Sequence, residues 1–506
     1  MRVLSALLFI LLVSSQCLQL SNDVGSFVSK ERLIRDIREL ASDKCMGRKA
    51  GTVGEKVAGE YIEREIRRIG LKALELNGVE EYRHKINLVK SVKVKVNING
   101  KEVVFGGLLG EGSKIANASG KLVFAGFGIT VEGHDDYKGE MLNGSIVVIL
   151  RGTPSEKIKE EYRYFGYKTV NALEHGASAV IIVSDPLRNY MNYPISMNLL
   201  SDRYPRVRDI VSLSISTLDC EKLFYMLKMN LTELQERIET KGAIGVIDLG
   251  VKCEIKVETI EIINYVGVIK GEKDEYVLIS AHYDHLGLDP NGRIFYGADD
   301  DASGVACILE VARAIVESNV GLERSVIVSF WSANEEGLVG SRKFVEMISE
   351  QELIGKIVAV INIDMVGAGK SNEFMVFRVE GDTASKALAN IIVEKGRRRN
   401  IEVSIKKSAG FDHYPFSLVG IPAVTLTSGS SLEEHVNHHT VWDTVENCSI
   451  DTVYNACILT LDVVLEISEK GITGGFKINY WFLAALILGV IILMIVGGRV
   501  CGRKFS

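Results

Sequence analysis

Five short polar clusters in the second half of the sequence combine imidazoles with carboxylates. They span residues 282–285, 297–304, 334–337, 362–364 and 438–443. So many acids on neighbouring loops would not all ionise without a compensating cation. Nitrogen and oxygen ligands without thiolates suit zinc, with cobalt or manganese as substitutes. The residue types therefore indicate a metal site, against the simpler alternative of solvated loop acids.

The surplus of acids is large enough for two metal ions. Such ions, about 3.5 to 4 Å apart, need one carboxylate between them and separate ligands on each side. The residues alone leave open which of Asp299, Asp300 and Asp301 lies between the ions. They also leave open which of Glu335 and Glu336 stays free as a base.

Buried strands and helices alternate in the region that carries these clusters. Apolar runs at 276–281, 325–330, 356–363 and 423–427 predict strands, and the patterns at 302–316 and 339–348 predict helices. This alternation predicts an α/β fold with a mostly parallel central sheet flanked by helices. Because sites in such sheets form at the carboxyl ends of the strands, we expect the five clusters to meet at one edge.

The preceding residues divide into two parts. Residues 29–71 have a helical pattern, in which Thr52 and Glu55 have the spacing of a capping box and Gly70 marks the end. Alternating residues from Val92 to Ile98 and a turn at Asn99 and Gly100 predict a hairpin with residues 103–105. Short apolar strands then predict a separate β-rich insert at 111–250, with a packing or substrate-gating role. The main domain would comprise 22–110 and 251–470.

Both ends of the sequence carry apolar runs. Residues 1–21 have the layout of a secretory signal peptide, and the uncharged run 480–498 is long enough to span a bilayer. Basic residues in the tail 499–506 favour a cytoplasmic C-terminus. The sequence thus predicts a single-pass protein of the cell membrane with its folded part extracytoplasmic. Acceptor sequences for N-linked sugar occur at Asn117, Asn143, Asn230 and Asn447.

Composition sets wider limits. The chain has 506 residues, so several folded units are expected, and its 47% apolar and 25% charged residues are ordinary for a globular protein. A net charge of -6 leaves no basic excess for nucleic acid. Six cysteines between the two terminal segments are too few for a disulfide scaffold, although Cys448 could pair with Cys457.

The five clusters, in this order, resemble the co-catalytic dizinc exopeptidases. This family includes bacterial leucyl aminopeptidases, aminopeptidase Y, plasma glutamate carboxypeptidase and glutamate carboxypeptidase II. Residues 122–218 look like the protease-associated domain inserted in many members, and residues 41–52 resemble their N-terminal segment. The resemblance implies a zinc exopeptidase (phosphorylase/hydrolase-like) fold, a zinc peptidase domain at 251–470 and two zinc ions per chain.

Carried over by position, the resemblance assigns a ligand set to each ion. It makes Asp300 the bridging ligand, with His282 and Asp364 on one zinc and Glu336 and His439 on the other. Glu335 becomes the catalytic base and acid, which takes a proton from the attacking water and returns it to the departing amine.

Two further residues acquire roles from this resemblance. Asp284 is expected to accept a hydrogen bond from His282 and to fix its tautomer. His438 stands where several relatives have tyrosine, and its imidazole could polarise the substrate carbonyl in place of the phenol. His285 has no assigned role.

The resemblance therefore predicts a membrane-anchored exopeptidase acting on peptide substrates, most simply an aminopeptidase. The first alternative is a carboxypeptidase or dipeptidase on the same site. The second is a catalytically dead, receptor-like protein, and the third is a glutaminyl cyclase, which shares the sheet but usually uses one zinc and lacks the insert. The oligomeric state does not follow from the sequence.

Overall fold

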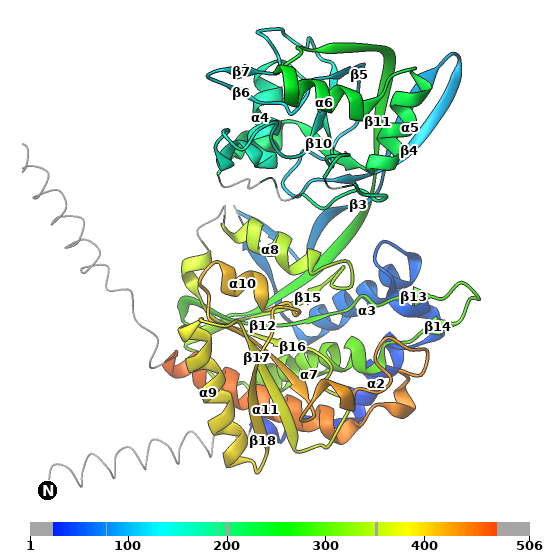
Figure 1. Cartoon of the computed structure of the whole chain (residues 1–506). Helices are drawn as coiled ribbons and strands as arrows, with labels where there is room; N and C mark the ends of the chain where they lie inside the picture. Colours follow the sequence, from blue (N-terminus) through cyan, green and yellow to red (C-terminus); the bar gives the residue numbers. More distant parts are fainter. Residues whose placement is uncertain are drawn as a thin grey trace, which may run out of the picture. The chain divides into compact units, whose positions relative to one another are not determined.

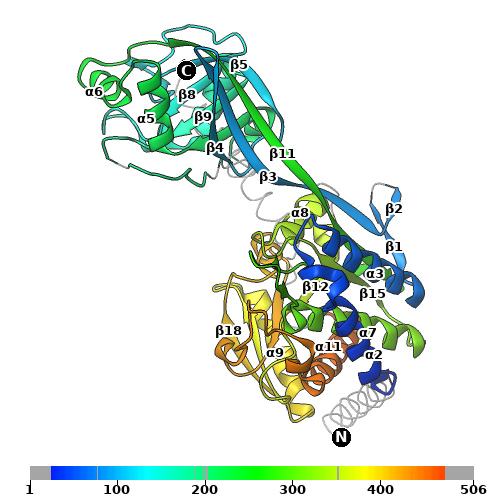
Figure 2. The same ribbon diagram turned by 90° about the vertical axis from the view of Figure 1, so that its right-hand side faces the viewer.

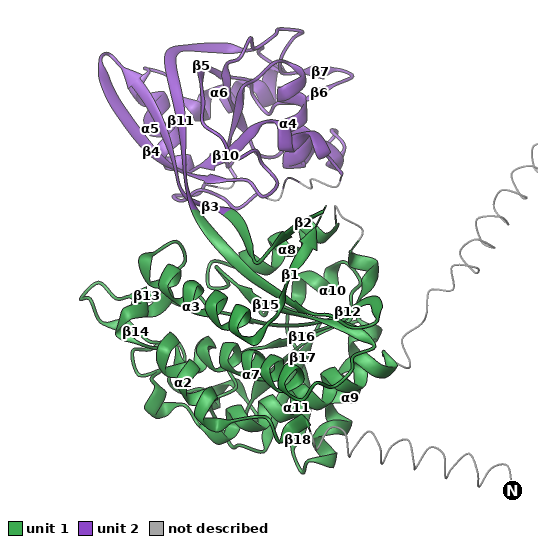
Figure 3. Cartoon of the chain, turned by 180° about the vertical axis from the view of Figure 1, so that it is seen from behind, with its two compact units in different colours: residues 1–86, 261–506 green, residues 87–260 purple. Residues whose placement is uncertain are grey.

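The computed structural model describes residues 24–472, except 77, 189, 198, 200–202 and 350–352. Contacts divide the chain into two compact units, unit 1 (residues 1–86 and 261–506) and unit 2 (Asn87–Ile260), shown in Figure 3. The chain enters unit 2 within strand β3 (Arg83–Ile98) and leaves it within β11 (Ile247–Ile269). The predicted signal peptide, membrane span and tail lie outside the described residues. None of the helices in the described part is long and apolar enough to cross a membrane.

A mostly parallel sheet forms the centre of unit 1, as predicted. Its strands, in spatial order, are β18 (Glu402–Lys407), β17 (Glu373–Arg378), β19 (Ala423–Ser428), β16 (Ile357–Ile363), β12 (Lys273–His282), β15 (Arg324–Trp331) and the end of β11. Strand β12 is parallel to both β15 and β16, and β16 is parallel to β19. The carboxyl ends of these four strands therefore share one edge.

Helices cover both faces of this sheet (Figure 1). On one face lie α2 (Lys30–Leu40), α7 (Gly304–Glu317), α9 (Thr383–Arg398) and α11 (Ile450–Lys470), and Figure 2 shows α2, α7 and α11 side by side. On the other lie α8 (Val339–Ser349) and α10 (Tyr414–Leu418). Alternation along β12 explains the two layers, because Val277 and Ile279 join the first core while Leu278 joins the second.

The helical pattern at 29–71 comprises two helices, and the predicted helix start at Thr52 and stop at Gly70 are confirmed. Helix α2 ends at Leu40, and α3 (Val53–Ile69) begins after Thr52, whose hydroxyl accepts a hydrogen bond from the Glu55 N–H, and ends at Gly70 with φ 91°. The break is set by a close approach of distant backbone, since a Cβ on Gly47 would lie 2.3 Å from the Gly287 carbonyl oxygen. It brings residues 43–52 against the loop after β12.

Unit 2 contains a second run of parallel strands, which joins the same hydrogen-bonded sheet through β3 and β11. Strands β5 (Ala118–Phe124), β8 (Ile146–Leu150), β9 (Ala179–Val183) and β10 (Val211–Ile215) are parallel neighbours in this order. The predicted hairpin is confirmed as β3 with β4 (Lys101–Leu109), and β4 pairs with β10. Helices α4 (Phe165–Glu174), α5 (Thr217–Met226) and α6 (Leu231–Lys241) complete the unit. Because the hairpin and β11 pair with these strands, the unit extends beyond residues 111–250.

One fully buried cation ties the strand ends of unit 2. The Lys168 ammonium on α4 donates to the carbonyl oxygens of Phe127 and Leu150, which follow β5 and end β8. Desolvation by burial lowers the pKa of Lys168 to about 7.

The cysteines in the described residues are free thiols, so the possible Cys448–Cys457 disulfide is absent. The two side chains have different surroundings. Cys457 lies in the core between α11 and α7, where its Sγ contacts the Cys307 carbonyl oxygen at 3.7 Å. Cys448 lies before α11, packed against Gly367.

Candidate metal centre

The structure brings together one residue from each of the five clusters. His282 ends β12, Glu335 follows β15 and Asp364 follows β16. Asp300 lies in the turn between β14 (Ile294–Phe295) and α7, and His439 lies in the loop after β19. Their ligand atoms meet because these strands end at one edge of the sheet.

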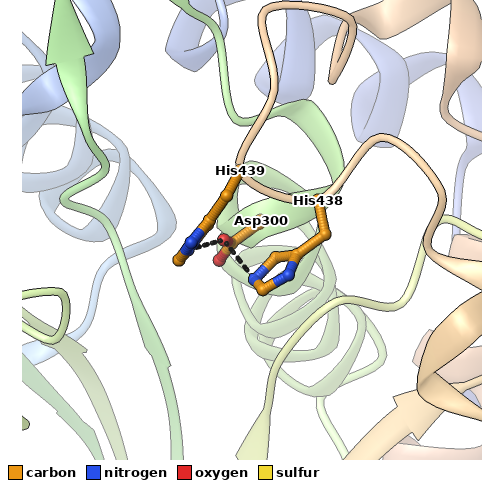
Figure 4. Close-up of side chains that lie close together, drawn as sticks. All are labelled: Asp300, His438 and His439. Carbon is orange, nitrogen blue, oxygen red and sulfur yellow. Dashed lines mark ion pairs between the residues drawn. The ribbon is translucent and has the colours of Figure 1, made fainter.

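Asp300 lies at the centre of this cluster. Its Oδ1 is 3.1 Å from His282 Nε2, and that nitrogen is 3.8 Å from Asp364 Oδ2. Its Oδ2 is 3.3 Å from both His438 Nε2 and His439 Nε2, which lie on either side of it in Figure 4. The two oxygens of one carboxylate therefore face two different sets of ligands.

Glu335 belongs to the second set. Its Oε1 is 3.1 Å from His439 Nε2 and 3.1 Å from His285 Nδ1. Its Oε2 accepts no hydrogen bond from the residues that the structure describes.

Glu336, the predicted ligand of the second zinc, does not join the cluster. Its carboxylate is 3.4 Å from the Lys49 ammonium, and its side chain is 42% exposed. Adjacent residues of an irregular loop point in different directions, and here the turn after β15 directs Glu335 inward. Of the two neighbouring glutamates, Glu335 thus lies in the cluster, and the ligand role of Glu336 stays a prediction.

Asp284 fixes the loop that carries Glu335. Its Oδ1 accepts the Asn334 N–H at 2.9 Å and its Oδ2 accepts the Glu335 N–H at 3.2 Å. His282 Nδ1 is 3.2 Å from the backbone carbonyl oxygen of Asp284 and 3.6 Å from its Oδ1, so the nearer acceptor is the backbone of the predicted partner and not its carboxylate. A second carboxylate, that of Asp412, accepts a hydrogen bond from the Asn334 side chain at 2.7 Å.

The electrostatics of the cluster follow from burial and hydrogen bonding. Burial opposes ionisation of Glu335, but hydrogen bonds from His285 and His439 lower its pKa to about 2. Hydrogen bonds with Asp300 and Glu335 raise the pKa of His439 to about 10. Burial, together with the charge of Asp300, raises the pKa of Asp364 to about 7. Protons on imidazoles thus balance the carboxylates, and a metal ion would replace them.

Three more carboxylates hold the turn around Asp300 in place. The two oxygens of Asp443 accept the N–H groups of Asp299 and Asp300 at 2.8 and 3.0 Å. Asp301 accepts the His282 N–H at 3.2 Å, and Asp299 accepts the Gly367 N–H at 2.7 Å. Asp299 also bonds His435 Nδ1 at 2.6 Å, a contact that the sequence analysis did not predict.

Arg48 is the positioning residue that sequence reasoning missed. The side chain is fully buried, and it donates to the carbonyl oxygens of Leu40, Tyr283, Tyr296 and Gly297 at 2.7 to 2.9 Å. It therefore fixes the backbone on both sides of the loop between β12 and α7.

The donors fit zinc. Within the described residues, three groups have ligand atoms within 4.8 Å of one another: Asp300 with His438 and His439; His282 with Asp300 and Asp364; and His285 with Asp300 and Glu335. All three contain Asp300, and each combines imidazole with carboxylate, which zinc binds well. Asp284, Asp443 and Arg48 hold the loops that carry these possible ligands. The site is therefore pre-formed.

Comparison with known proteins points the same way. Residues 264–464 match the model of Peptidase family M28, and residues 118–223 match the PA domain. Aminopeptidase YwaD of Bacillus subtilis is 29% identical over 219 residues, which cover 41% of this chain and 45% of that protein. Leucine aminopeptidase 1 of Uncinocarpus reesii is 27% identical over 256 residues, covering 47% and 62%. The chain thus spans less than two thirds of the length of these relatives.

The chain is also similar to solved structures of aminopeptidases. BSAP, a zinc aminopeptidase from Bacillus subtilis, has a TM-score of 0.48 at 22% identity and covers 88% of this chain and 96% of its own. The aminopeptidase from Aneurinibacillus sp. strain AM-1 has a TM-score of 0.47 at 21% identity, covering 88% and 96%. From the sequence matches, the chain carries a Peptidase family M28 domain, together with a PA domain in the segment that precedes it.

Proposed function

We propose that the chain is a zinc-dependent exopeptidase that removes residues from the N-terminus of peptides. The observation that carries this proposal is the position of Asp300, whose two oxygens face separate ligand sets. His282, Asp300 and Asp364 would hold one zinc ion. Asp300 and His439 would hold the other, together with Glu336 as the resemblance predicts or with Glu335, whose carboxylate contacts His439.

Two bound zinc ions would lower the pKa of a water molecule between them and polarise the substrate carbonyl. The side chains have distinct tasks around that chemistry. Glu335 directs Oε1 toward the imidazoles of His285 and His439 and leaves Oε2 without a partner among the described residues. We assign to Oε2 the proton that leaves the attacking water and later joins the departing amine.

His438 has the position of a substrate-facing donor in this scheme. Its side chain is 42% exposed, while Asp300 beside it is buried. Its ring lies close to that of His439, with centroids 3.8 Å apart and the ring planes tilted by 30°. The imidazole N–H would donate to the substrate carbonyl oxygen from the open side of the site.

The decisive experiment compares wild type with Glu335→Gln, as full-length protein loaded with zinc and given a peptide library. We expect wild type to shorten peptides from the N-terminus, and the variant to lose turnover by about 10² to 10⁴-fold. Equal rates in the two proteins would contradict the role of Glu335. A peptide with a blocked N-terminus separates the two exopeptidase classes, because only a carboxypeptidase would shorten it. The relatives include both, since a Glutamate carboxypeptidase 2 homolog of Caenorhabditis briggsae matches at 26% identity.

A second candidate is a metal-binding protein without hydrolytic activity, similar in kind to a receptor. The observation that favours it is the use of both neighbouring glutamates, since Glu335 contacts two imidazoles and Glu336 pairs with Lys49. Both carboxylates are then already engaged in contacts with basic side chains, and neither is fully available to accept a proton from water. Stoichiometric zinc binding by wild type, with no cleavage of any peptide in the library, would favour this candidate.

We also propose that residues 480–498 anchor the protein in the cell membrane, with both units on the extracytoplasmic side. The support is the uncharged apolar run followed by Arg499, Arg503 and Lys504. Deletion of 480–506 should move the protein from the membrane fraction to the soluble fraction. Retention of the shortened protein in sedimented membranes would contradict the anchor.

A further inference from the structure

Unit 2 contains a cavity of about 670 Å³ at the carboxyl ends of β8 and β9. Its volume lies within the range of about 300 to 1,000 Å³ that is typical of sites for small ligands. Residues 151–156, which follow β8, line one part of it, and residues 163–165, at the start of α4, line another. Asp185 and Arg188, which follow β9, complete the lining. Because ligands of parallel α/β sheets bind at this edge, the cavity has the location of a binding site.

Arg151 is a half-buried cation in this cavity. Its backbone N–H donates to the Val183 carbonyl oxygen at 2.7 Å, which ties the residue to the end of β9. Its guanidinium lies 5.8 Å from the centre of the Phe165 ring, and within the described residues it forms no hydrogen bond and no ion pair. A charged group that leaves water is normally paired, and a guanidinium carries five N–H donors. All five donors of Arg151 are therefore available to a ligand.

The other arginines of the cavity show that this lack of a partner is specific. Arg188 contacts Asp185 and Glu239 at 2.7 Å, although its side chain is 54% exposed and could be solvated by water instead. Arg163 is exposed and, like Arg151, has no hydrogen bond or ion pair with the residues that the structure describes. Two arginines without a carboxylate partner thus line the same cavity.

The lining also indicates the kind of ligand. Its three arginines and two acids, Glu156 and Asp185, leave a single net positive charge, which matches a carboxylate better than a phosphate dianion. Pro154, Tyr164 and Phe165 add apolar surface, which an aliphatic or aromatic group beside the carboxylate would cover. A peptide carries both kinds of group close together.

We infer that unit 2 binds a peptide through a carboxylate, to which Arg151 donates two parallel hydrogen bonds. Arg163 adds a second positive charge from its exposed position. The carboxylate is the C-terminus of the peptide or the side chain of an aspartate or glutamate, which share the same chemistry. An apolar residue next to it packs on Tyr164 and Phe165. This site goes beyond the proposed function, because it lies in the other unit and needs neither zinc nor cleavage.

Fluorescence anisotropy with short peptides tests this binding. The probe is Gly-Gly-Gly-Leu-Phe with fluorescein on its N-terminus and a free C-terminal carboxylate. The full-length protein is kept in a chelator, so that no metal ion can hold the carboxylate. We expect saturable binding of a carboxylate peptide, and binding weaker by about tenfold or more for the C-terminal amide, since a hydrogen bond to a charged group is lost. An amide with glutamate before the leucine identifies the source, because it restores binding only if a side chain is recognised.

Variants connect the binding to the cavity. Arg151→Gln should weaken binding of the carboxylate peptide by about tenfold or more, and Arg163→Gln, whose charge is exposed, by about two- to fivefold. Arg206→Gln is the matched control and should bind as wild type does, because Arg206 is exposed on unit 2 but pairs with Glu174 outside the cavity. Arg163→Gln also covers the case in which Arg151→Gln does not fold, since Arg163 has no polar contact in the described residues to lose.

The inference would be overturned by equal affinities for the carboxylate peptide and both amides, or by the absence of saturable binding to wild type. Wild-type affinity in Arg163→Gln and in folded Arg151→Gln would overturn it as well. Displacement of the probe by inorganic phosphate at a lower concentration than by acetate would contradict the assignment to a carboxylate. Wild type that binds the probe as expected but cleaves no peptide would support this inference and contradict only the proposed function.

Discussion

Each unit has a parallel sheet and one fully buried cation bonded to carbonyl oxygens near its carboxyl edge. In unit 1 the cation is Arg48, with five carbonyl partners, and in unit 2 it is Lys168, with two. The guanidinium keeps its charge in any folded protein, whereas the pKa of Lys168 falls to about 7. The same architecture therefore has a permanent charge in one unit and a titratable one in the other.

The acids at the two edges differ as well. In unit 2 the carboxylate of Asp185, after β9, bonds the Arg188 guanidinium at 2.7 Å and the Gln235 amide at 2.8 Å. In unit 1 the carboxylates of Asp300 and Glu335 contact imidazoles. Acids paired with arginine are already neutralised, while acids paired with histidine can exchange its proton for a metal ion. The comparison shows that parallel strands alone do not make a metal site at a sheet edge. The acids there must contact histidines and not arginines.

The largest expected effect comes from removing the shared carboxylate. Asp300→Asn should weaken zinc binding by more than about 100-fold, because both proposed ligand sets lose a member. Asp185→Asn is the matched control at the edge of the other sheet and should leave zinc content unchanged. Zinc per chain, measured by mass spectrometry after dialysis, checks both. Full zinc content in Asp300→Asn would contradict the proposed difference between the acids of unit 1 and those of unit 2.

Replacing Arg48 tests how much its buried charge contributes to the stability of unit 1. Arg48→Met leaves five carbonyl oxygens without this donor, and we expect the free energy of unfolding of unit 1 to fall by about 3 kcal/mol. Urea unfolding followed by tryptophan fluorescence measures this, since Trp331 is fully buried in unit 1. The zinc affinity should fall too, because the loops that carry Asp300 and His285 lose their anchor. An unchanged unfolding midpoint would show that the carbonyls find other partners.

The titratable charge predicts a pH dependence for unit 2. The folded pKa of Lys168 is about 7 against 10.5 ordinarily, so between these values the unfolded chain holds a proton that the folded unit has released. Stability contributed by this group therefore rises with pH, by roughly 2 kcal/mol from pH 7 to 9. Pulse proteolysis in urea, read on peptides of β8 and β9, should show this rise in wild type. Lys168→Met should lack it, and an equal slope in the variant would assign the rise to other groups.

The smallest expected effect concerns the exposed rim of the unit 1 edge. His438→Ala should lower turnover about tenfold, less than the roughly 10² to 10³-fold cost of removing a buried donor. Zinc content should stay that of wild type, because the partner of His438 in the cluster is a single oxygen of Asp300. Peptide turnover and zinc content measured on the same sample check this. Turnover equal to wild type would leave His438 without a role.

Much of the fold was predictable because local patterns and packing agree. The apolar runs of β12, β15, β16 and β19 are buried on both faces, as parallel strands between helix layers must be. The turn at Asn99 and Gly100, with φ 53° and 79°, follows from the ability of these residues to adopt positive φ. The five polar clusters could be placed at one edge of the sheet because the strands before them were predictable.

The missed features depend on contacts between distant residues. The capping box at Thr52 marks the start of α3, but the path of the chain between α2 and α3 depends on the approach of residue 287 to Gly47, which lies far away in sequence. The choice between Glu335 and Glu336 depends on the path of the loop after β15, which Asp284 fixes through two backbone N–H groups. His285 and Arg48 were not assigned roles because their partners are far away in sequence.

The hydrogen bonds of Arg48 also impose an order on biosynthesis. Three of its carbonyl partners lie 235 to 249 residues further along the chain, so at about 5 to 20 residues per second the ribosome needs roughly 12 to 50 seconds to supply them. Unit 2 is one continuous segment and is complete before β12 emerges. The inserted unit can thus fold before the ribosome has supplied the strands that complete the sheet of unit 1 and its candidate metal centre.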